Sequence, residues 1–265
     1  MSQAEPFVRE SGIGPAVVCI HANAGTSSQW RSLMDLLASR HRVLAPDCYG
    51  SGRSPEWHSD RFISLQDEVV FLDPVFTRAG ASFHLVGHSY GAAVALVAAL
   101  AHRDRVRSLA LYEPTLFALV DADSAPPNEA DGIRHTVADA SAALDRGEAD
   151  AAAERFIDYW MGVGSWRATP EDRKPTIAAS VKNIRRWAHA LFTEPTPLAA
   201  FAALRIPVLI MTGGVSTPAA HGVARRLLSA LPTARHHDFP QLGHMGPVTH
   251  PDQVNATVAR FLDEV

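Results

Sequence analysis

The stretch FHLVGHSYGAAVALVAALAH, residues 83–102, decides the fold of this chain. Phe83–Gly87 is a short apolar run of strand length, and Tyr90–His102 is an alanine-rich run long enough for a buried helix. The segment Gly87-His88-Ser89-Tyr90-Gly91 joins the two, and its glycines let the chain turn sharply. A strand that passes directly into a helix in this way is typical of a parallel sheet flanked by helices.

The same alternation of strand-length apolar runs and longer helical patterns continues on both sides of this stretch. It predicts an α/β fold with a mostly parallel sheet flanked by helices. From about residue 133 to 203 the chain has helical stretches and no convincing strand, so we expect a helical cap at residues 115–203 and a core at residues 1–114 and 204–265. The other predicted strands are Ala16–Ile20, Arg42–Pro46, Val106–Tyr112, Pro207–Thr212 and Arg235–Phe239, and the other predicted core helices are Gln29–Ser39, Leu65–Arg78, Ala219–Leu231 and Pro251–Glu264.

The composition is that of an ordinary globular domain, with 47% hydrophobic and 20% charged residues in a chain of 265. The net charge of −4 argues against a nucleic acid or an anionic membrane as partner, since both select basic surfaces. No apolar run reaches the length of a membrane span. Because Cys19 and Cys48 are too few for a disulfide framework and the N-terminal segment has no secretory signal, we expect free thiols in a cytoplasmic protein. A small molecule is the expected partner, and the oligomeric state stays open, a homodimer included.

Ser89 stands at the centre of the G-x-S-x-G pattern, between a predicted strand and a predicted helix. In that context the turn presents the hydroxyl in a strained position, and the helix N-terminus favours developing negative charge. A serine hydroxyl needs an adjacent base before it attacks a carbonyl at neutral pH. His244, in the segment LGHMGP of residues 242–247, follows the last predicted strand and is predicted to be that base. His88 and His21 are interpreted as packing and turn-bracing residues.

Four motifs give the chain a resemblance to the α/β-hydrolase superfamily over nearly its whole length. They are HANAG at residues 21–25, DCYGSGRS at residues 47–54, the G-x-S-x-G turn, and Gly243-His244. The resemblance implies a cap insertion before the last strands, a slot that residues 115–203 fit, and a triad of serine, acid and histidine. It also implies a reaction that needs neither a metal nor an organic cofactor, but it does not specify a substrate.

The position of the acid departs from the family pattern. The usual aspartate follows the strand Pro207–Thr212, where this chain reads Gly213-Gly214-Val215-Ser216 and has Ser216 in place of the acid. Some family members, haloalkane dehalogenases among them, carry the acid after the preceding strand, and there this chain has Glu113. By this resemblance Glu113 is predicted to be the third member of the triad, with a structural ion pair or a turn cap as the alternative.

The oxyanion hole of the family uses the backbone N–H after the nucleophile and one from the HANAG turn, which by position are those of Tyr90 and Asn23. Ala22 replaces the family glycine, a change that leaves the backbone donors in place. The Asn23 side chain is a possible further donor, as the matching asparagine is for halide in the dehalogenases, although those enzymes use an aspartate where this chain has Ser89. Expected substrate contacts are Ala22, Met245 and Trp160.

The pair His236-His237 is interpreted as structural and not as a metal site, because adjacent strand residues point to opposite faces of a sheet. The sequence therefore predicts a serine hydrolase that cleaves a small or medium-sized, fairly hydrophobic ester, lactone or thioester. Two alternatives stay open. The same triad supports C–C bond hydrolysis, perhydrolysis or acyl transfer to alcohols, and a ligand-binding protein without catalysis can use the same scaffold.

Overall fold

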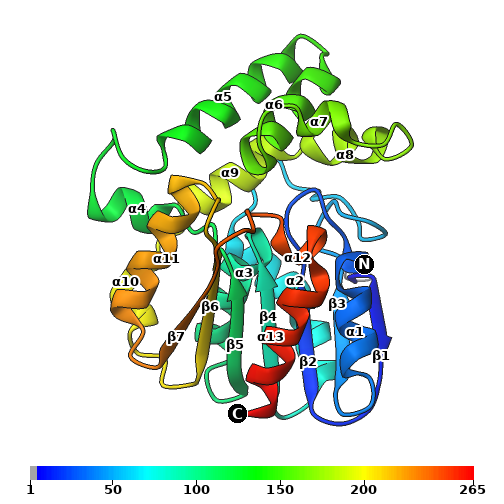
Figure 1. Ribbon diagram of the computed structural model, residues 1–265, viewed down its shortest axis with the longest axis vertical. Coiled ribbons are helices and arrows are strands. Elements are labelled where there is room, and N and C mark those ends of the chain that lie inside the picture. The colour runs from blue at the N-terminus through cyan, green and yellow to red at the C-terminus, as the bar shows by residue number, and fades with distance from the viewer. Residues whose placement is uncertain (1–4) are drawn as a thin grey trace.

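One seven-stranded sheet with helices on both faces makes up the core of the computed structural model, which describes residues 5–265 (Figure 1). The strand order is β1-β3-β2-β4-β5-β6-β7, and every neighbouring pair is parallel except the antiparallel pair β1 and β3. The predicted α/β class is therefore confirmed. The strands are β1 (Val8–Ser11), β2 (Ala16–Ile20), β3 (Arg42–Pro46), β4 (Phe83–His88), β5 (Val106–Tyr112), β6 (Val208–Gly213) and β7 (Ala234–Phe239).

Strand β1 is the element that the sequence pattern did not predict. Its residues read VRES and none of them is fully buried, so that no apolar run marks it. It pairs along one side only, with β3 at the edge of the sheet, where burial is not required of every residue. The other predicted strands agree with the structure to within one residue at either end.

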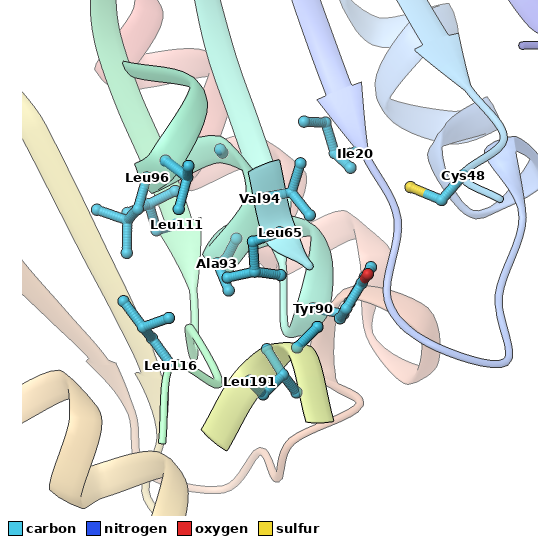
Figure 2. Packing of buried hydrophobic residues seen from close by; sticks show 14 of the residues in the cluster. Ile20, Cys48, Leu65, Tyr90, Ala93, Val94, Leu96, Leu111, Leu116 and Leu191 are labelled. Atoms are coloured by element: carbon cyan, nitrogen blue, oxygen red, sulfur yellow. The ribbon is translucent and has the colours of Figure 1, made fainter. Parts of the chain in front are cut away.

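The core consists of two hydrophobic clusters, one on each face of the sheet. Because side chains alternate along a strand, Val17 of β2 belongs to one cluster and Val18 to the other. Figure 2 shows part of the larger cluster, to which Ile20 of β2, Leu111 of β5 and Leu96 of α3 all belong. The smaller cluster lies under α1 (Arg31–Leu37) and α13 (Pro251–Asp263), and the larger one under α2 (Leu65–Ala79), α3 (Tyr90–Ala101) and α11 (Pro218–Ala230).

The predicted helix Gln29–Ser39 is shorter in the structure and has a different start. A 3₁₀ turn, η1 (Ser27–Trp30), precedes α1, and the Thr26 side chain caps that turn by accepting from the Ser28 N–H. Thr, like Ser, favours such N-cap positions because its oxygen satisfies a backbone donor that has no partner within the helix.

Between β5 and β6, where the structure describes every residue, the chain forms helices and loops without a strand. Figure 1 shows α5 to α9 over the carboxyl edge of the sheet, which is the edge where open α/β sheets bind their ligands. The helices of this segment are α4 (Ala118–Asp123), α5 (Asp131–Asp145), α6 (Ala149–Met161), α7 (Ser165–Ala168), α8 (Lys174–Val181), α9 (Ile184–Phe192) and α10 (Leu198–Phe201).

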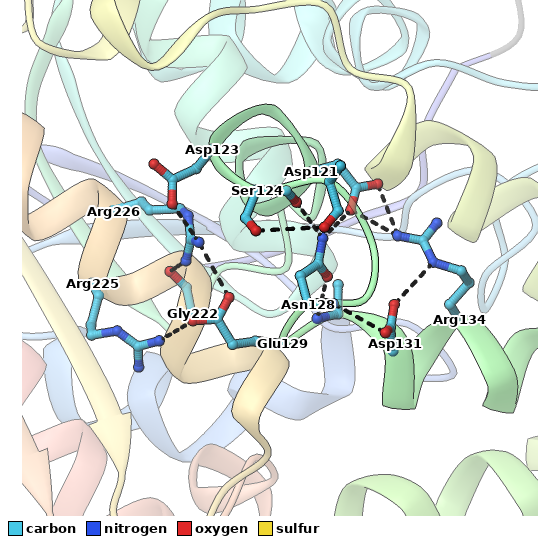
Figure 3. A network of polar contacts seen from close by, with 12 residues as sticks. Asp121, Asp123, Ser124, Asn128, Glu129, Asp131, Arg134, Gly222, Arg225 and Arg226 are labelled. Atoms are coloured by element: carbon cyan, nitrogen blue, oxygen red, sulfur yellow. Dashed lines mark hydrogen bonds and ion pairs between the residues drawn. The ribbon is translucent and has the colours of Figure 1, made fainter.

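A network of charged side chains fastens the loop between α4 and α5 to α11 (Figure 3). Arg226 of α11 binds Asp123 at 2.7 Å and Glu129 at 3.2 Å. On the side of α5, Arg134 binds Asp121 at 2.7 Å. The entry to the predicted cap segment is thus tied to the core by ion pairs as well as by packing.

The two cysteines are free, as predicted, and both are buried; burial raises the pKa of both the Cys19 and the Cys48 thiol. Within residues 5–265 no helix is both long enough and apolar enough to cross a membrane. In the same part of the chain, His, Cys, Asp and Glu side chains do not gather in groups of three or more that suit a metal ion.

Candidate active site

Ser89 sits at the sharp turn between β4 and α3, with a backbone φ of 55°. Its N–H donates to the Tyr112 carbonyl at 2.9 Å, which fixes the turn to the end of β5. The flanking glycines are required because a Cβ at Gly87 would stand 2.5 Å from the Cα of Ala92, and one at Gly91 would collide with the Ile20 carbonyl oxygen. The sequence therefore builds the turn around a serine that must have a glycine two positions away on either side.

His244 lies in the loop between β7 and α12 (Gly246–Thr249), and its ring reaches the Ser89 hydroxyl. The distance from His244 Nε2 to Ser89 Oγ is 2.9 Å, and the ring is only 2% exposed. The His88 Nε2–H donates to the His244 carbonyl at 2.8 Å, so that His88 braces the loop from the interior as its packing role predicts. Burial lowers the pKa of His88, which keeps this neighbouring ring uncharged.

Glu113 follows β5 directly and accepts from the other side of the same imidazole. Its Oε2 lies 2.6 Å from His244 Nδ1, and its side chain is fully buried. Strands β4 and β5 are neighbours in the sheet, and their register places His88 opposite Tyr112, the residue before Glu113. The nucleophile and the carboxylate therefore leave the sheet side by side, and His244 bridges them from above.

Two further donors hold the Glu113 carboxylate. The Gly213 N–H, at the end of β6, donates to Oε1 at 2.7 Å, and the Ser216 hydroxyl donates to Oε2 at 2.6 Å. Ser216 occupies the position where the family pattern has its acid, and in this chain its hydroxyl binds the carboxylate of Glu113. From the sequence, Ser216 was recognisable only as the residue that replaces the usual acid. Its bond to Glu113 was not predictable, since no local signal ties it to a residue 103 positions away.

Backbone strain is concentrated at this site. Among residues 5–265, the non-glycine residues with positive φ are Ala24, Ser89 and Glu113, at 55°, 55° and 44°. Such conformations cost about 1–3 kcal/mol each and persist where the surrounding structure fixes them, most often at functional sites. All three lie on loops that follow the strands β2, β4 and β5 at one edge of the sheet.

The backbone N–H groups of Asn23 and Tyr90 are available at the positions predicted for the oxyanion hole. Within residues 5–265 neither one donates a hydrogen bond to backbone or side chain. The turn that carries Asn23 is braced by His21, whose Nδ1–H donates to the Ala22 carbonyl at 2.7 Å and whose Nε2 accepts the Cys48 N–H at 3.1 Å. The turn-bracing role predicted for His21 is thus confirmed.

A buried carboxyl group that the sequence analysis missed lies beneath the turn. Glu68 of α2 accepts from the Tyr90 hydroxyl at 3.2 Å and from the Tyr49 N–H at 3.3 Å. Burial raises the pKa of Glu68 to about 8, so that it is mostly protonated at neutral pH. The contact fixes the side chain of Tyr90, the residue whose N–H is predicted to hold the oxyanion.

A cavity opens beside Ser89, between the sheet edge and the helices above it. The space between its walls, together with the open solvent at its mouth, measures about 340 Å³. Ser89, Asn23 and Thr115 are its polar wall residues, and the others are apolar: Phe117, Ile133, Val137, Phe156, Trp160, Ile184, Trp187, Ala188, Leu191 and Phe192. An apolar pocket with a few fixed polar groups is the usual form of a small-molecule site.

The predicted substrate contacts are placed differently from one another. Trp160 lines the cavity and also stacks on the His244 ring, with centroids 3.8 Å apart. Ala22 and Met245 are not among the wall residues within the described part of the chain. Ala22 is instead buried in its turn, where its carbonyl accepts from the Gly25 N–H, and Met245 stands directly before α12, where its side chain makes no capping hydrogen bond to that helix.

Residues 15–251 match the family model described as alpha/beta hydrolase fold. The chain is 33% identical to a haloalkane dehalogenase of Agrobacterium fabrum over 118 residues, a match that spans 44% of this chain and 38% of that protein.

Other matches extend over nearly the whole chain. A 2-hydroxy-6-oxo-6-(2'-aminophenyl)hexa-2,4-dienoic acid hydrolase of Metapseudomonas resinovorans is 25% identical over 260 residues, covering 94% of this chain and 85% of that protein. Among solved structures, an alpha/beta hydrolase of Sphaerobacter thermophilus superposes with a TM-score of 0.72 at 26% identity, over 97% of this chain and 96% of that one.

Proposed function

The chain belongs to the α/β-hydrolase fold family, and from this premise we propose that it is a serine hydrolase that cleaves a small or medium-sized ester, lactone or thioester. One observation carries the proposal. The chain of hydrogen bonds from Ser89 Oγ to His244 Nε2, at 2.9 Å, and from His244 Nδ1 to Glu113 Oε2, at 2.6 Å, is the arrangement that activates a serine.

In the first step His244 takes the Ser89 proton while Ser89 Oγ attacks the substrate carbonyl carbon. The negative charge that forms on the carbonyl oxygen is held by the N–H groups of Asn23 and Tyr90. Glu113 fixes the tautomer in which Nε2 is free to accept, and it stabilises the imidazolium through Nδ1. His244 then returns the proton to the leaving alcohol or thiol, and an acyl-enzyme on Ser89 remains.

In the second step a water molecule attacks the acyl-enzyme carbonyl while His244 takes one of its protons. The same oxyanion donors act again, and the proton passes from His244 to Ser89 Oγ as the acid product leaves. Every proton that moves is thus carried by one imidazole, and the buried carboxylate of Glu113 keeps its charge throughout.

The character of the cavity wall favours a neutral, fairly hydrophobic acyl group. Its apolar residues, Phe117 and Phe156 among them, exclude water from the side of Ser89 that the substrate occupies. A carboxylate placed against this wall would lose its hydration without a cationic side chain among the lining residues to replace it. This consideration favours esters, lactones and thioesters over the dienoic acid named for the Metapseudomonas relative.

Labelling with a small fluorophosphonate tests the proposal. We expect rapid addition of one phosphonyl group, located by peptide mapping at Ser89, and no addition in Ser89→Ala. A folded wild-type protein that resists labelling would contradict the proposed nucleophile and would favour the ligand-binding alternative.

C–C bond hydrolysis is the second candidate, because the Metapseudomonas relative matches 94% of this chain. It uses the same triad on a different substrate. A panel that sets simple p-nitrophenyl esters against vinylogous diketones separates the two reactions. A kcat/KM for the diketones well above that for every ester would transfer the proposal to the second reaction, and added peroxide or alcohol would reveal perhydrolysis or acyl transfer.

A further inference from the structure

Thr115 lines the cavity beside Ser89, and its buried hydroxyl is unpaired among the described residues. The side chain is only 1% exposed, and its Oγ1 has no hydrogen-bond partner within residues 5–265. A threonine hydroxyl can donate one hydrogen bond and accept two, and most buried hydroxyls in proteins use this capacity. Thr115 therefore differs from an ordinary packing residue, since valine would fill the same space without an unpaired polar atom.

The segment around Thr115 is held firmly from both sides. On one side Glu113 is fixed by its N–H, which donates to the Met211 carbonyl at 2.9 Å, and by the contacts of its carboxylate. On the other side Leu116 is fully buried in the larger core cluster (Figure 2), and the Phe117 N–H donates to the Thr115 carbonyl at 2.8 Å. The hydroxyl thus has a fixed position relative to the triad, which is the requirement for selecting a substrate group.

The surroundings of this hydroxyl identify its partner by chemistry. A buried hydroxyl without a partner costs free energy, and a ligand atom that pairs with it removes that cost. Asn23 is the other wall residue with a polar side chain besides the nucleophile, and the wall around them is apolar. A neutral oxygen acceptor satisfies the Thr115 O–H in such a setting, whereas a charged group would be desolvated there.

We propose that Thr115 is a specificity residue whose hydroxyl binds a neutral oxygen in the acyl part of the substrate, so that the enzyme prefers keto-, alkoxy- or hydroxyacyl esters to plain fatty acyl esters. The inference rests on the proposed function of Ser89 as an acylated nucleophile. The acyl part is chosen because it stays attached beside the walled cavity through both steps, whereas the leaving group departs after the first.

The test compares p-nitrophenyl esters in matched pairs that differ by an oxygen. The pairs are methoxyacetate with butanoate, methoxypropanoate with pentanoate, and levulinate with isohexanoate. Each pair is measured on the wild type, on Thr115→Val and on Thr115→Ser, and the quantity compared is the ratio of kcat/KM within a pair. Differences in the intrinsic reactivity of the esters cancel because every protein is given the same pair.

We expect Thr115→Val to lower that ratio about 10- to 100-fold for at least one pair, the size of effect that the loss of one buried hydrogen bond produces. The all-carbon esters should change little, and Thr115→Ser should keep the wild-type preference because it keeps the hydroxyl. Ratios for all three pairs that are equal in the wild type and Thr115→Val would overturn the inference.

Thermal unfolding of the ligand-free proteins provides a second readout. Because Thr115→Val removes an unpaired buried hydroxyl and keeps the shape, we expect it to raise the melting temperature. A lower melting temperature would mean that the hydroxyl has a structural partner, and it would overturn the inference even if turnover changed. A wild type that hydrolyses no ester and is not labelled at Ser89 would instead contradict the proposed function itself.

Discussion

Replacing Glu113 by glutamine changes one oxygen of the proposed triad into an NH₂ group and is the most direct perturbation of it. The hydrogen-bond partners of the side chain at position 113 determine the orientation of the new amide. If its oxygen keeps the Gly213 N–H, now 2.7 Å from Oε1, its NH₂ group faces His244 Nδ1 and donates to it. In the opposite orientation the NH₂ group faces the Gly213 N–H, and because both groups are donors no hydrogen bond forms between them. The first orientation is therefore favoured.

That orientation stabilises the wrong tautomer of His244. With Nδ1 accepting from the amide, the ring proton moves to Nε2, which then cannot take the proton of Ser89. The imidazolium also loses the charge that stabilises it. Together these losses should lower kcat by about 10⁴-fold, or about 5 kcal/mol of transition-state stabilisation.

The assay measures kcat with a p-nitrophenyl ester and the rate of fluorophosphonate labelling, on the wild type and on Glu113→Gln. Glu194→Gln is the matched control, since Glu194 is also buried but accepts from Thr196 and lies outside the site. Circular dichroism and melting temperature verify that each variant is folded. A folded Glu113→Gln enzyme with kcat within about tenfold of the wild type would refute the reasoning.

Three further predictions follow from the same contacts. Glu68→Gln should make the melting temperature less dependent on pH. Folding raises the pKa of Glu68 from 4.5 to about 8, so the contribution of its carboxyl group to stability is full below pH 4.5 and is lost as pH rises through 8. A melting temperature of the wild type that does not fall between about pH 5 and 8 relative to that of the variant would contradict this. Trp160→Leu removes the ring stacked on His244 and should lower kcat about 2- to 30-fold, whereas Trp160→Phe should stay closer to the wild type. Equal kcat values for the wild type and both variants would exclude a role for this stacking in turnover. Ser216→Ala removes a donor to the Glu113 carboxylate and should lower kcat about tenfold, whereas Ser216→Thr, which keeps the hydroxyl, should not; steady-state kinetics on both variants decides this.

Much of the fold was predictable because its elements are marked locally. The apolar runs of β2, β4, β5 and β6 are buried on both faces of the sheet and need no partner to be recognised. β1 was not predictable, since an edge strand such as Val8–Ser11 carries no run of buried residues. The start of α1 was misplaced because the 3₁₀ turn before it has the same apolar spacing as a helix.

Some residues of the candidate site are likewise marked by local motifs, and others are not. Ser89 and His244 stand in motifs that are visible within a few residues, whereas Glu113 was predicted only through the family resemblance. The roles of Ser216 and Glu68 depend on pairs that are 103 and 22 positions apart in the chain and meet only in the folded structure, and a single sequence carries no record of such pairs. For the same reason the sequence predicted Trp160 as a substrate contact but could not predict its stacking on His244.

The position of Glu113 directly after β5 also determines how the chain can be divided. Residues 122–127 are exposed, and a break there leaves both Ser89 and Glu113 on the first fragment. His244 lies on the second. Neither fragment alone contains an activated serine, and the pairing of β5 with β6 can rejoin them. On the proposed function, ester hydrolysis would then report reassembly of the two fragments, because the second half supplies the base together with Gly213 and Ser216, the donors that hold the Glu113 carboxylate.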